Sequence, residues 1–241
     1  MTKGNAVFQR VNVYGREFTL AAEPSDFLRS VDTGVWEFWT FRIFDAFLTP
    51  ETTCIDAGAW IGVTALYASC LCKRVYAVEP DPVAFRILAG NVAANNAGNI
   101  ELFEGALADR QGTCTVGGSK LGDSMTRMSC KANAVTVPCT TLREFVNSRG
   151  IEDPVFIKMD VEGAETLILK DVDFFVERKP DLYMSTHGWW QTEDPESGKD
   201  GFAILMRVGK LYKHAYHALS HIPLTFNEPG DLMVVFTDKD I

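Results

Sequence analysis

The amino-acid sequence predicts an α/β protein with a parallel, doubly wound sheet. From Thr52 onward, short apolar segments alternate with helical segments, an order that produces parallel strands joined by right-handed crossovers. A glycine-containing turn at 56–62 joins the first of these strands directly to a helix. Polar or glycine residues follow five successive strands, so this topology gathers them at one edge of the sheet.

The composition fits one well-buried domain with extensions. The chain has 241 residues, of which 46% are hydrophobic, and its formal net charge is -9. Such an acidic chain has no general attraction to nucleic acid or anionic membranes, although a local basic patch is compatible with these numbers. The six cysteines form no CxxC pair, which favours free thiols. Without an apolar signal core or a run of about 18 apolar residues, we expect a soluble, cytoplasmic protein.

The first 50 residues are expected to form an extension of the main domain at 51–241, within one compact unit. Alternating apolar residues in 6–23 predict a hairpin, and a short helix follows. The segment 36–47 predicts a strongly aromatic helix that packs on the domain. Glu37 is expected in the first turn of this helix, where the helix dipole stabilises an acid.

The elements of the main domain are predicted from apolar runs and from the residues that typically begin or end helices and strands. Asp81 followed by Pro82 is typical of a helix start, with Asp as the cap and Pro in the first turn. The predicted strands are 53–56, 74–79, 100–103, 155–159 and 181–185, and the predicted helices are 62–71, 82–96, 140–146, 164–170 and 202–209.

Three segments depart from this alternation. Four glycines and short β-prone pieces in 106–139 predict a small antiparallel excursion with a mobile loop. The polar segment 191–201 predicts a surface loop. The last two strands, 211–218 and 232–237, are joined too closely for a parallel crossover and are expected to be antiparallel.

The turn at 56–62 is suited to a ligand. Gly58 permits close approach of the backbone, Gly62 permits tight packing of the helix on the strand, and the helix start presents free N–H groups and a positive dipole end. Asp56 would repel a pyrophosphate but would suit an ammonium group. On this turn alone, a binding site and an ordinary strand–helix junction with a capping Asp are equally compatible with the residues.

Glu79 follows Asp56 by 23 positions and ends the second strand. An acid at this place can accept hydrogen bonds from both hydroxyls of a ribose, and the alternative is a solvated acid at a strand end. An NAD enzyme would have the same acid. However, the spacing Gly58-x-x-x-Gly62 is not G-x-G-x-x-G, and Asp56 would repel the phosphates of a dinucleotide. The pattern therefore favours a nucleoside without a pyrophosphate.

A family resemblance is carried by three segments: Asp56-Ala-Gly-Ala-Trp-Ile-Gly62, Glu79-Pro-Asp81 and Lys158-Met-Asp160-Val-Glu162-Gly-Ala-Glu165. Together they resemble the FkbM family of S-adenosylmethionine-dependent methyltransferases over residues 32–188. The resemblance implies a class I methyltransferase fold, Rossmann-like with seven strands of which the last is antiparallel. It also implies S-adenosylmethionine as cofactor and O-methylation of hydroxyls on sugars and natural products. Trp60 and Arg143 depart from the family pattern, which usually has Asn and Asp there.

The resemblance also implies roles for single residues. Asp56 and Gly58 are expected at the methionine end of the cofactor, and Glu79 at the ribose. Trp60 would place an aromatic face by the sulfonium or simply pack, Asp81 would lie near the ribose or only cap its helix, and Glu37 would reach the cofactor or have no ligand. The expected cofactor-binding residues are Glu37, Asp56, Gly58, Ala59, Trp60, Gly62, Glu79, Pro80, Asp81, Gly105, Ala106 (by the adenine) and Asp160.

Methyl transfer from a sulfonium is an in-line displacement, so catalysis is mostly alignment, plus removal of the hydroxyl proton. Asp160 and His187 are the candidate bases, and Trp189 and Trp190 could form an acceptor platform. A hydrogen-bonded turn histidine is the alternative for His187. Asp160 and Glu162 are too weak a pair of ligands to predict a metal.

We therefore expect an S-adenosylmethionine-dependent methyltransferase that acts on a hydroxyl of a small molecule. Two alternatives are an NAD-type oxidoreductase and a non-catalytic S-adenosylmethionine-binding module. The expected partner is a small hydroxylated acceptor, with neither nucleic acid nor membrane. Methylation of nitrogen or of a carboxylate is compatible with the same residues, and the sequence leaves the oligomeric state open.

Overall fold

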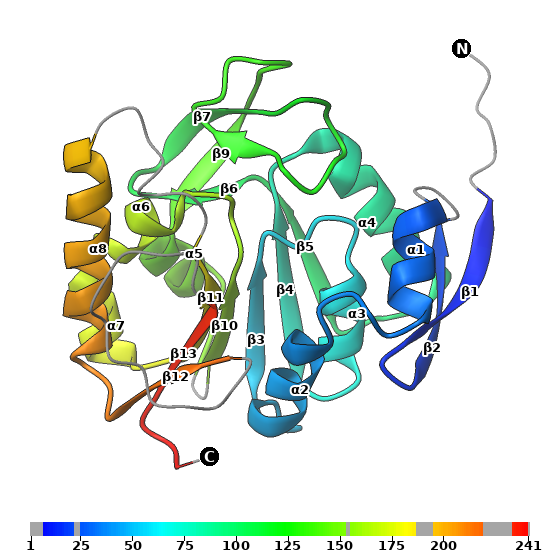
Figure 1. Cartoon of the computed structure of the whole chain (residues 1–241), viewed down its shortest axis with the longest axis horizontal. Coiled ribbons are helices and arrows are strands. Elements are labelled where there is room, and N and C mark those ends of the chain that lie inside the picture. The colour runs from blue at the N-terminus through cyan, green and yellow to red at the C-terminus, as the bar shows by residue number, and fades with distance from the viewer. Residues whose placement is uncertain (1–6, 22–24, 153–154, 187–194, 219–232, 241) are drawn as a thin grey trace.

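The structure is a computed structural model that describes residues 7–21, 25–152, 155–186, 195–218 and 233–240, without the side chains of 195–200. A seven-stranded sheet with the order β12-β13-β11-β10-β3-β4-β5 forms its centre (Figure 1). Its strands are β3 (Thr53–Ala57), β4 (Arg74–Glu79), β5 (Ile100–Glu104), β10 (Val155–Met159), β11 (Asp181–Ser185), β12 (His214–His217) and β13 (Met233–Thr237).

The sheet confirms the predicted topology. Strands β11, β10, β3, β4 and β5 are parallel, whereas β13 runs antiparallel to both β11 and β12. After β3 the chain winds outward through β4 and β5, and it later returns through β10, on the other side of β3, to β11. The winding therefore reverses between β3 and β10, which is where open α/β sheets bind ligands.

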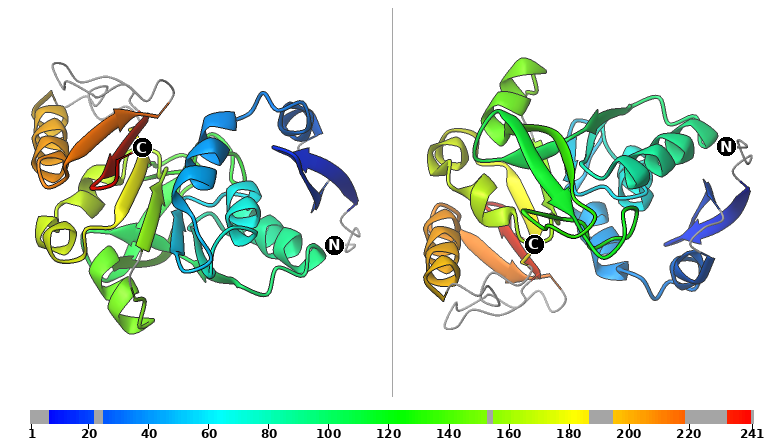
Figure 2. Two further views of the ribbon diagram at one scale, coloured as in Figure 1. Left: turned by 90° about the horizontal axis from the view of Figure 1, so that it is seen from below. Right: turned by 90° about the horizontal axis from the view of Figure 1, so that it is seen from above.

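Helices cover both faces of the sheet, as the two views of Figure 2 show. Successive strand residues point to opposite faces, so Cys54 belongs to one core cluster and Ile55 to the other. Helices α2 (Phe38–Phe47), α3 (Val63–Ser69) and α4 (Pro82–Ala94) pack on the first face. Helices α5 (Leu142–Ser148), α6 (Glu165–Leu169), α7 (Val172–Arg178) and α8 (Pro195–Gly209) pack on the second.

Among the predicted boundaries, those of α2 and α8 are wrong in the segments that matter most for the site. Helix α2 begins at Phe38, and Glu37 precedes it in the left-handed conformation with φ 42°. Glu37 is thus outside the first turn, because a left-handed residue cannot continue a right-handed helix. Helix α8 begins at Pro195, so 195–201 is not a loop. Its polar residues are compatible with helix, and proline is favourable in a first helical turn.

The segment 106–139 forms a second, small sheet, of which the antiparallel part was predicted and the parallel part was not. Its order is β6-β9-β7-β8, and β7 is antiparallel to both β8 and β9, whereas β6 and β9 are parallel. The segment 118–126 connects β7 to β8 and lies by the cavities described below. The strands are β6 (Ala106–Ala108), β7 (Gly112–Gly117), β8 (Arg127–Met128) and β9 (Val135–Thr141).

The predicted N-terminal hairpin is confirmed as β1 (Phe8–Val13) and β2 (Arg16–Ala21), followed by α1 (Ser25–Asp32). Asn91 of α4 and Asn95, the residue that follows this helix, bind the hairpin. Asn95 exchanges hydrogen bonds of 2.8 and 2.7 Å with the backbone of Thr19, and Asn91 accepts one of 2.8 Å from Ala21 N. Asn91 Nδ2 also donates to Ile61 O at 2.8 Å. None of the helices within the described ranges has the length and apolar content that a bilayer crossing requires.

Candidate functional site

The carboxyl ends of β3, β4 and β10 meet at the glycine turn. The N–H groups of Gly58 and Ala59 both donate to Val78 O at 3.0 Å, which joins the turn to β4. Asp160 N donates to Ala57 O at 3.0 Å, which joins β10 to β3. Gly58 has φ +79°, and a Cβ on it would lie 1.8 Å from Asp160 O. Only glycine therefore fits at this position.

Two adjoining cavities open at this edge of the sheet. The larger has a volume of about 360 Å³ and is lined by Trp36, Glu37, Trp39 and Lys158 among others. The smaller has a volume of about 50 Å³ and lies by Glu79, Pro80, Ala106 and Leu107. The two cavities share the lining residues Gly58, Trp60, Ser124, Asp160 and Glu162.

Glu79 is fixed at the smaller cavity by the backbone. Its Oε2 accepts a hydrogen bond of 2.8 Å from Trp60 N, and its Oε1 accepts one of 2.7 Å from Asp81 N. Burial raises the pKa of Glu79 to about 7, although both N–H groups act to lower it. Since a carboxylate has about four acceptor positions, the remaining ones are free for donors of a ligand, such as a pair of hydroxyls.

Asp81 is confirmed as the cap of α4. Its Oδ1 accepts hydrogen bonds from Val83 N at 2.7 Å and Ala84 N at 3.2 Å. Its Oδ2 accepts from Gly122 N at 2.6 Å and from Thr126 Oγ1 at 2.7 Å. Both oxygens are thus engaged inside the protein, and Asp81 holds the segment 118–126 as well as the helix start.

Trp60 connects the turn to the same segment. Its Nε1 donates to Gly122 O at 3.1 Å, and its ring contacts the ring of Phe27 edge to face, with centroids 4.4 Å apart. The indole therefore has a packing role, and it also lines both cavities. The other departure from the family pattern, Arg143, binds the carboxylate of Asp171 with two hydrogen bonds of 2.7 and 2.9 Å, away from the site.

A buried lysine neutralises part of the acidic lining. Lys158 Nζ lies 3.1 Å from Asp56 Oδ1, 3.7 Å from Asp160 Oδ2 and 3.3 Å from Gly58 O. Burial would lower the pKa of Lys158, but the carboxylates of Asp56, Asp160 and Glu37 raise it above its ordinary value. The lysine is therefore charged, and it holds the ends of β3 and β10 together.

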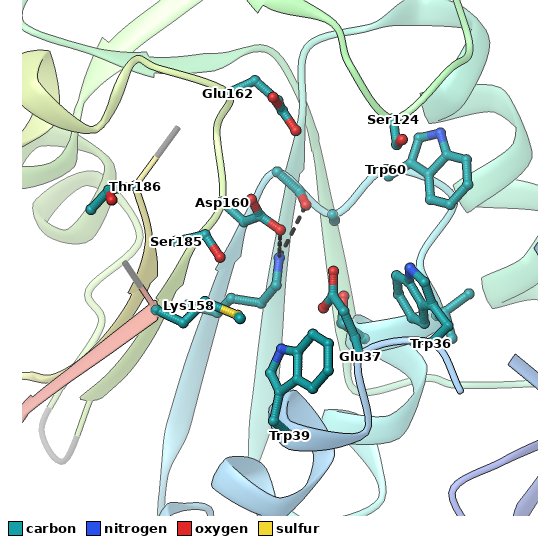
Figure 3. A pocket seen from close by; sticks show the side chains of 15 residues that line it. Trp36, Glu37, Trp39, Trp60, Ser124, Lys158, Asp160, Glu162, Ser185 and Thr186 are labelled. Carbon is teal, nitrogen blue, oxygen red and sulfur yellow. Dashed lines mark hydrogen bonds and ion pairs between the residues drawn. The ribbon is translucent and has the colours of Figure 1, made fainter. Parts of the chain in front are cut away.

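Glu37 lies on the wall of the larger cavity opposite Asp160. Figure 3 shows its carboxyl group directed into the cavity, between the rings of Trp36 and Trp39. Thr40 Oγ1 donates to Glu37 Oε2 at 2.9 Å, and the hydroxyl of Tyr183 lies 2.9 Å from Thr40 Oγ1. Burial and the charge of Asp160 raise the pKa of Glu37 to about 7, while Lys158 and Thr40 act to lower it.

Not every predicted residue reaches a cavity. Asp56 has no exposed surface, and its carboxylate is bound by Thr64 Oγ1 at 2.7 Å and paired with Lys158. Gly62 faces Leu88, and Gly105 N donates to Glu79 O at 3.1 Å, so neither lines a cavity. His187, Trp189 and Trp190 lie outside the described residues. Within the described ranges, no three His, Cys, Asp or Glu side chains are arranged to hold a metal ion.

Sequence reasoning gave no role to several lining residues. Lys158 is the single charged residue in a buried strand, a signal that could have identified it. Trp39 Nε1 is buried and has no hydrogen-bond partner among the described residues, which could not be anticipated from sequence. Ser185, Thr186 and Met233 complete the wall from β11 and β13.

The region 56–215 matches the model of the Methyltransferase FkbM domain. The ribosomal protein L11 methyltransferase of Clostridium perfringens is 41% identical over 69 residues, which are 28% of this chain and 22% of that protein. The corresponding protein of Pelotomaculum thermopropionicum is 37% identical over 71 residues, 29% of this chain and 23% of that one. The chain thus spans less than a quarter of the length of these relatives.

Solved structures of similar shape include an rRNA methylase from Streptococcus thermophilus, with 13% identity and a TM-score of 0.47 over 83% of this chain and 95% of that one. Another is M. jannaschii TYW2 in complex with AdoMet, with 15% identity and a TM-score of 0.43 over 98% and 86% of the two chains. Likeness of this degree does not identify a substrate.

The residues present fit S-adenosylmethionine. The smaller cavity offers Glu79 with free acceptor positions for hydroxyls, and the larger offers carboxylates for a ligand that carries positive charge. The family match covers well over half of the chain. The protein therefore belongs to the FkbM methyltransferase family.

Proposed function

We propose that this protein transfers a methyl group from S-adenosylmethionine to a hydroxyl group of a small molecule. The observation that carries the proposal is the pair of adjoining cavities at the reversal point of the sheet, which share Gly58 and Asp160. The lining of the smaller cavity suits a nucleoside beside Glu79. The larger one, of about 360 Å³, leaves room for an acceptor beside Asp160.

In this proposal Glu79 accepts hydrogen bonds from the ribose hydroxyls, and Pro80, Ala106 and Leu107 supply apolar surface for the adenine. Gly58 and Ala59 let the backbone approach the methionine part. Asp56 acts through Lys158, because its own carboxylate is covered. Trp60, Gly62, Asp81 and Gly105 hold the turn and its neighbours in place.

When bound, the cofactor supplies an electrophilic methyl group on a positively charged sulfur. The protein has to align the acceptor hydroxyl with it and accept the hydroxyl proton. Asp160 is the first candidate for this proton because its side chain lies at the junction of the two cavities. His187 is the second candidate, on the strength of its place just after the strand 181–185.

The charge of the site favours a small, non-anionic acceptor. The cavity wall carries Glu37, Asp160 and Glu162, and the whole chain has a net charge of -9, so a polyanion such as RNA would be repelled. Transfer to a protein is the second candidate function. It is favoured by the local similarity to the ribosomal protein L11 methyltransferases.

The test has a binding arm and a turnover arm. Calorimetry should give heat with S-adenosylmethionine and none with NAD. A screen of hydroxylated metabolites for release of S-adenosylhomocysteine, followed by identification of the methylated atom, should then reveal an O-methylated product. An N-methylated product, or turnover only with a protein acceptor, would contradict the proposed acceptor.

With an acceptor in hand, Asp160→Asn should lower kcat by about 100-fold if Asp160 accepts the proton. Asp173→Asn, the same change at an exposed carboxylate of α7, is the control and should leave kcat unchanged. Should Asp160→Asn and His187→Ala both retain full activity, the assignment of the base would fail.

A further inference from the structure

We propose that Glu37 makes this site selective for the positively charged methyl donor over its neutral product, and that the selectivity is lost when Glu37 is protonated. The inference rests on the proposed binding of S-adenosylmethionine across the two cavities. It assigns a charge-recognition role to a residue that lies outside the region matched by the family model, 56–215.

The cation nearest to Glu37 is already paired with other carboxylates. Among the described residues, Lys158 is the cation that faces Glu37, and it already lies 3.1 Å from Asp56 and 3.7 Å from Asp160. No ion pair within 4 Å joins Glu37 to a cation in the part of the chain that the structure describes. Its hydrogen-bond donor is the neutral hydroxyl of Thr40.

The backbone at Glu37 is in an unfavourable conformation. Its φ of 42° and ψ of 36° place a non-glycine residue in the left-handed region, which is unfavourable for an L-amino acid by about 1 kcal/mol or more. The side chain makes no capping hydrogen bond to α2. The chain therefore holds a strained residue with its carboxyl group directed into the cavity (Figure 3).

Polar and charged groups from several elements act on the carboxyl group of Glu37. Thr40 faces it from α2, Lys158 and Asp160 from the end of β10, Asp56 from β3, and Tyr183 from β11. Glu162 lines the same cavity from the segment after β10. The charges that act on Glu37 are thus two carboxylates and one ammonium, an environment that disfavours its negative charge and would be improved by a cationic ligand.

The consequence for binding follows from linkage. Since the pKa of Glu37 is about 7 in the ligand-free protein, the group is largely protonated at pH 5.5 and largely ionised above pH 8. A cation in the cavity lowers this pKa, so its binding releases a proton and strengthens as pH rises through 7. The α-ammonium is common to the donor and the product and cancels in their ratio, whereas a neutral sulfur in place of the sulfonium gives no such effect. If the sulfonium lowers the pKa by about one unit, the preference for the donor grows about tenfold.

The experiment compares three ligands that share the adenosine and amino-acid parts. S-adenosylmethionine has a sulfonium, sinefungin has an ammonium in its place, and S-adenosylhomocysteine has a neutral sulfur. Their dissociation constants are measured by calorimetry at pH 5.5, 6.5 and 7.5, in two buffers of different ionisation enthalpy. We expect the affinities of the two charged ligands, relative to S-adenosylhomocysteine, to rise about 3- to 10-fold over this range, with release of a fraction of a proton.

The variant Glu37→Gln should abolish this rise while binding S-adenosylhomocysteine with little change. The matched control Glu17→Gln removes an exposed carboxylate of β2 and should retain the wild-type pH dependence. If Glu37→Gln is unstable, the wild-type pH series and its proton release stand alone as the test.

The inference would be overturned if the affinities of the two charged ligands relative to S-adenosylhomocysteine did not change with pH. It would also be overturned if they rose with pH in Glu37→Gln as in the wild type. Either result would leave the proposed function intact. Failure of wild-type protein to bind any of the three would instead overturn the proposed function.

Discussion

Two glutamates that line adjoining cavities, Glu79 and Glu37, have the same pKa of about 7 but are held in different ways. Glu79 accepts hydrogen bonds from two backbone N–H groups of neighbouring turns. Glu37 depends on Thr40, which contacts Tyr183 at a separation of 143 positions, and on the charges of β10. Glu79 is fixed by hydrogen bonds, whereas the ionisation of Glu37 depends on neighbouring charges. The substitution of Gln for each should therefore affect ligand binding differently.

The largest expected effect is that of Gly58→Ala, because Gly58 lines both cavities. A Cβ there would lie 1.8 Å from Asp160 O, and φ is +79°, so the turn or the end of β10 must move. We expect a loss of about 3 kcal/mol or more in the free energy of unfolding, measured with urea. Calorimetry should show no binding of S-adenosylmethionine.

Gly98→Ala is the control for this substitution, because a Cβ at Gly98 meets nothing within 4 Å. It should change the free energy of unfolding by less than about 1 kcal/mol. Equal effects of the two substitutions would show that the turn tolerates a side chain.

The next effect is that of Glu79→Gln. An amide NH₂ would then face Trp60 N or Asp81 N, placing donor against donor. We expect the affinity for S-adenosylmethionine and S-adenosylhomocysteine to fall equally, by about 100-fold, because both share the ribose. This uniform loss contrasts with the selective loss expected from Glu37→Gln. A variant at Glu79 that discriminated between the two ligands would contradict the distinction.

A smaller effect concerns the stability of the ligand-free protein. The pKa of Glu37 is raised from 4.5 to about 7, so the native state binds more protons than the unfolded state between these values. The stabilisation is fully present below pH 4.5 and is lost as pH rises through 7. Glu37→Gln should therefore lose less stability between pH 5 and 7.5 than the wild type, by on the order of 1 kcal/mol, in urea unfolding. If the free energy of unfolding of Glu37→Gln fell between pH 5 and 7.5 by as much as that of the wild type, the carboxyl group of Glu37 would have to be solvated.

The smallest effect is expected from Trp39→Phe. The buried Nε1 of Trp39 has no partner among the described residues, so removing it should leave the free energy of unfolding unchanged or raise it by about 1 kcal/mol. Trp60→Phe is the matched comparison, because it loses a hydrogen bond to Gly122 O and should lower stability by about 1 kcal/mol. Thermal unfolding of the two variants decides between these signs.

The difference between the two glutamates also explains what could be predicted from sequence. The turn at 56–62, the acid Glu79 and the cap Asp81 depend on residues close along the chain, and their local structure was predicted correctly. The position of Asp160 followed from the rule that parallel strands end at one edge.

The Glu37 side could not be predicted in the same way. The left-handed backbone at Glu37 contradicts the helical pattern of its segment, and its surroundings come from β3, β10 and β11. Polarity alone suggested a loop where α8 begins, because the first turns of that helix have no apolar stripe. His187 lies outside the described residues, and its role stays a prediction.

The position of Asn91 bears on which segments of the chain must stay together for the protein to fold. Asn91 is fully buried, and its amide joins Ala21 of the hairpin to Ile61 of the glycine turn. Although the family match begins at residue 56, a chain shortened past Ala21 would deprive this amide of one of its two backbone partners. We therefore expect chimaeras that exchange the family region of this protein to be more stable when the hairpin accompanies α4.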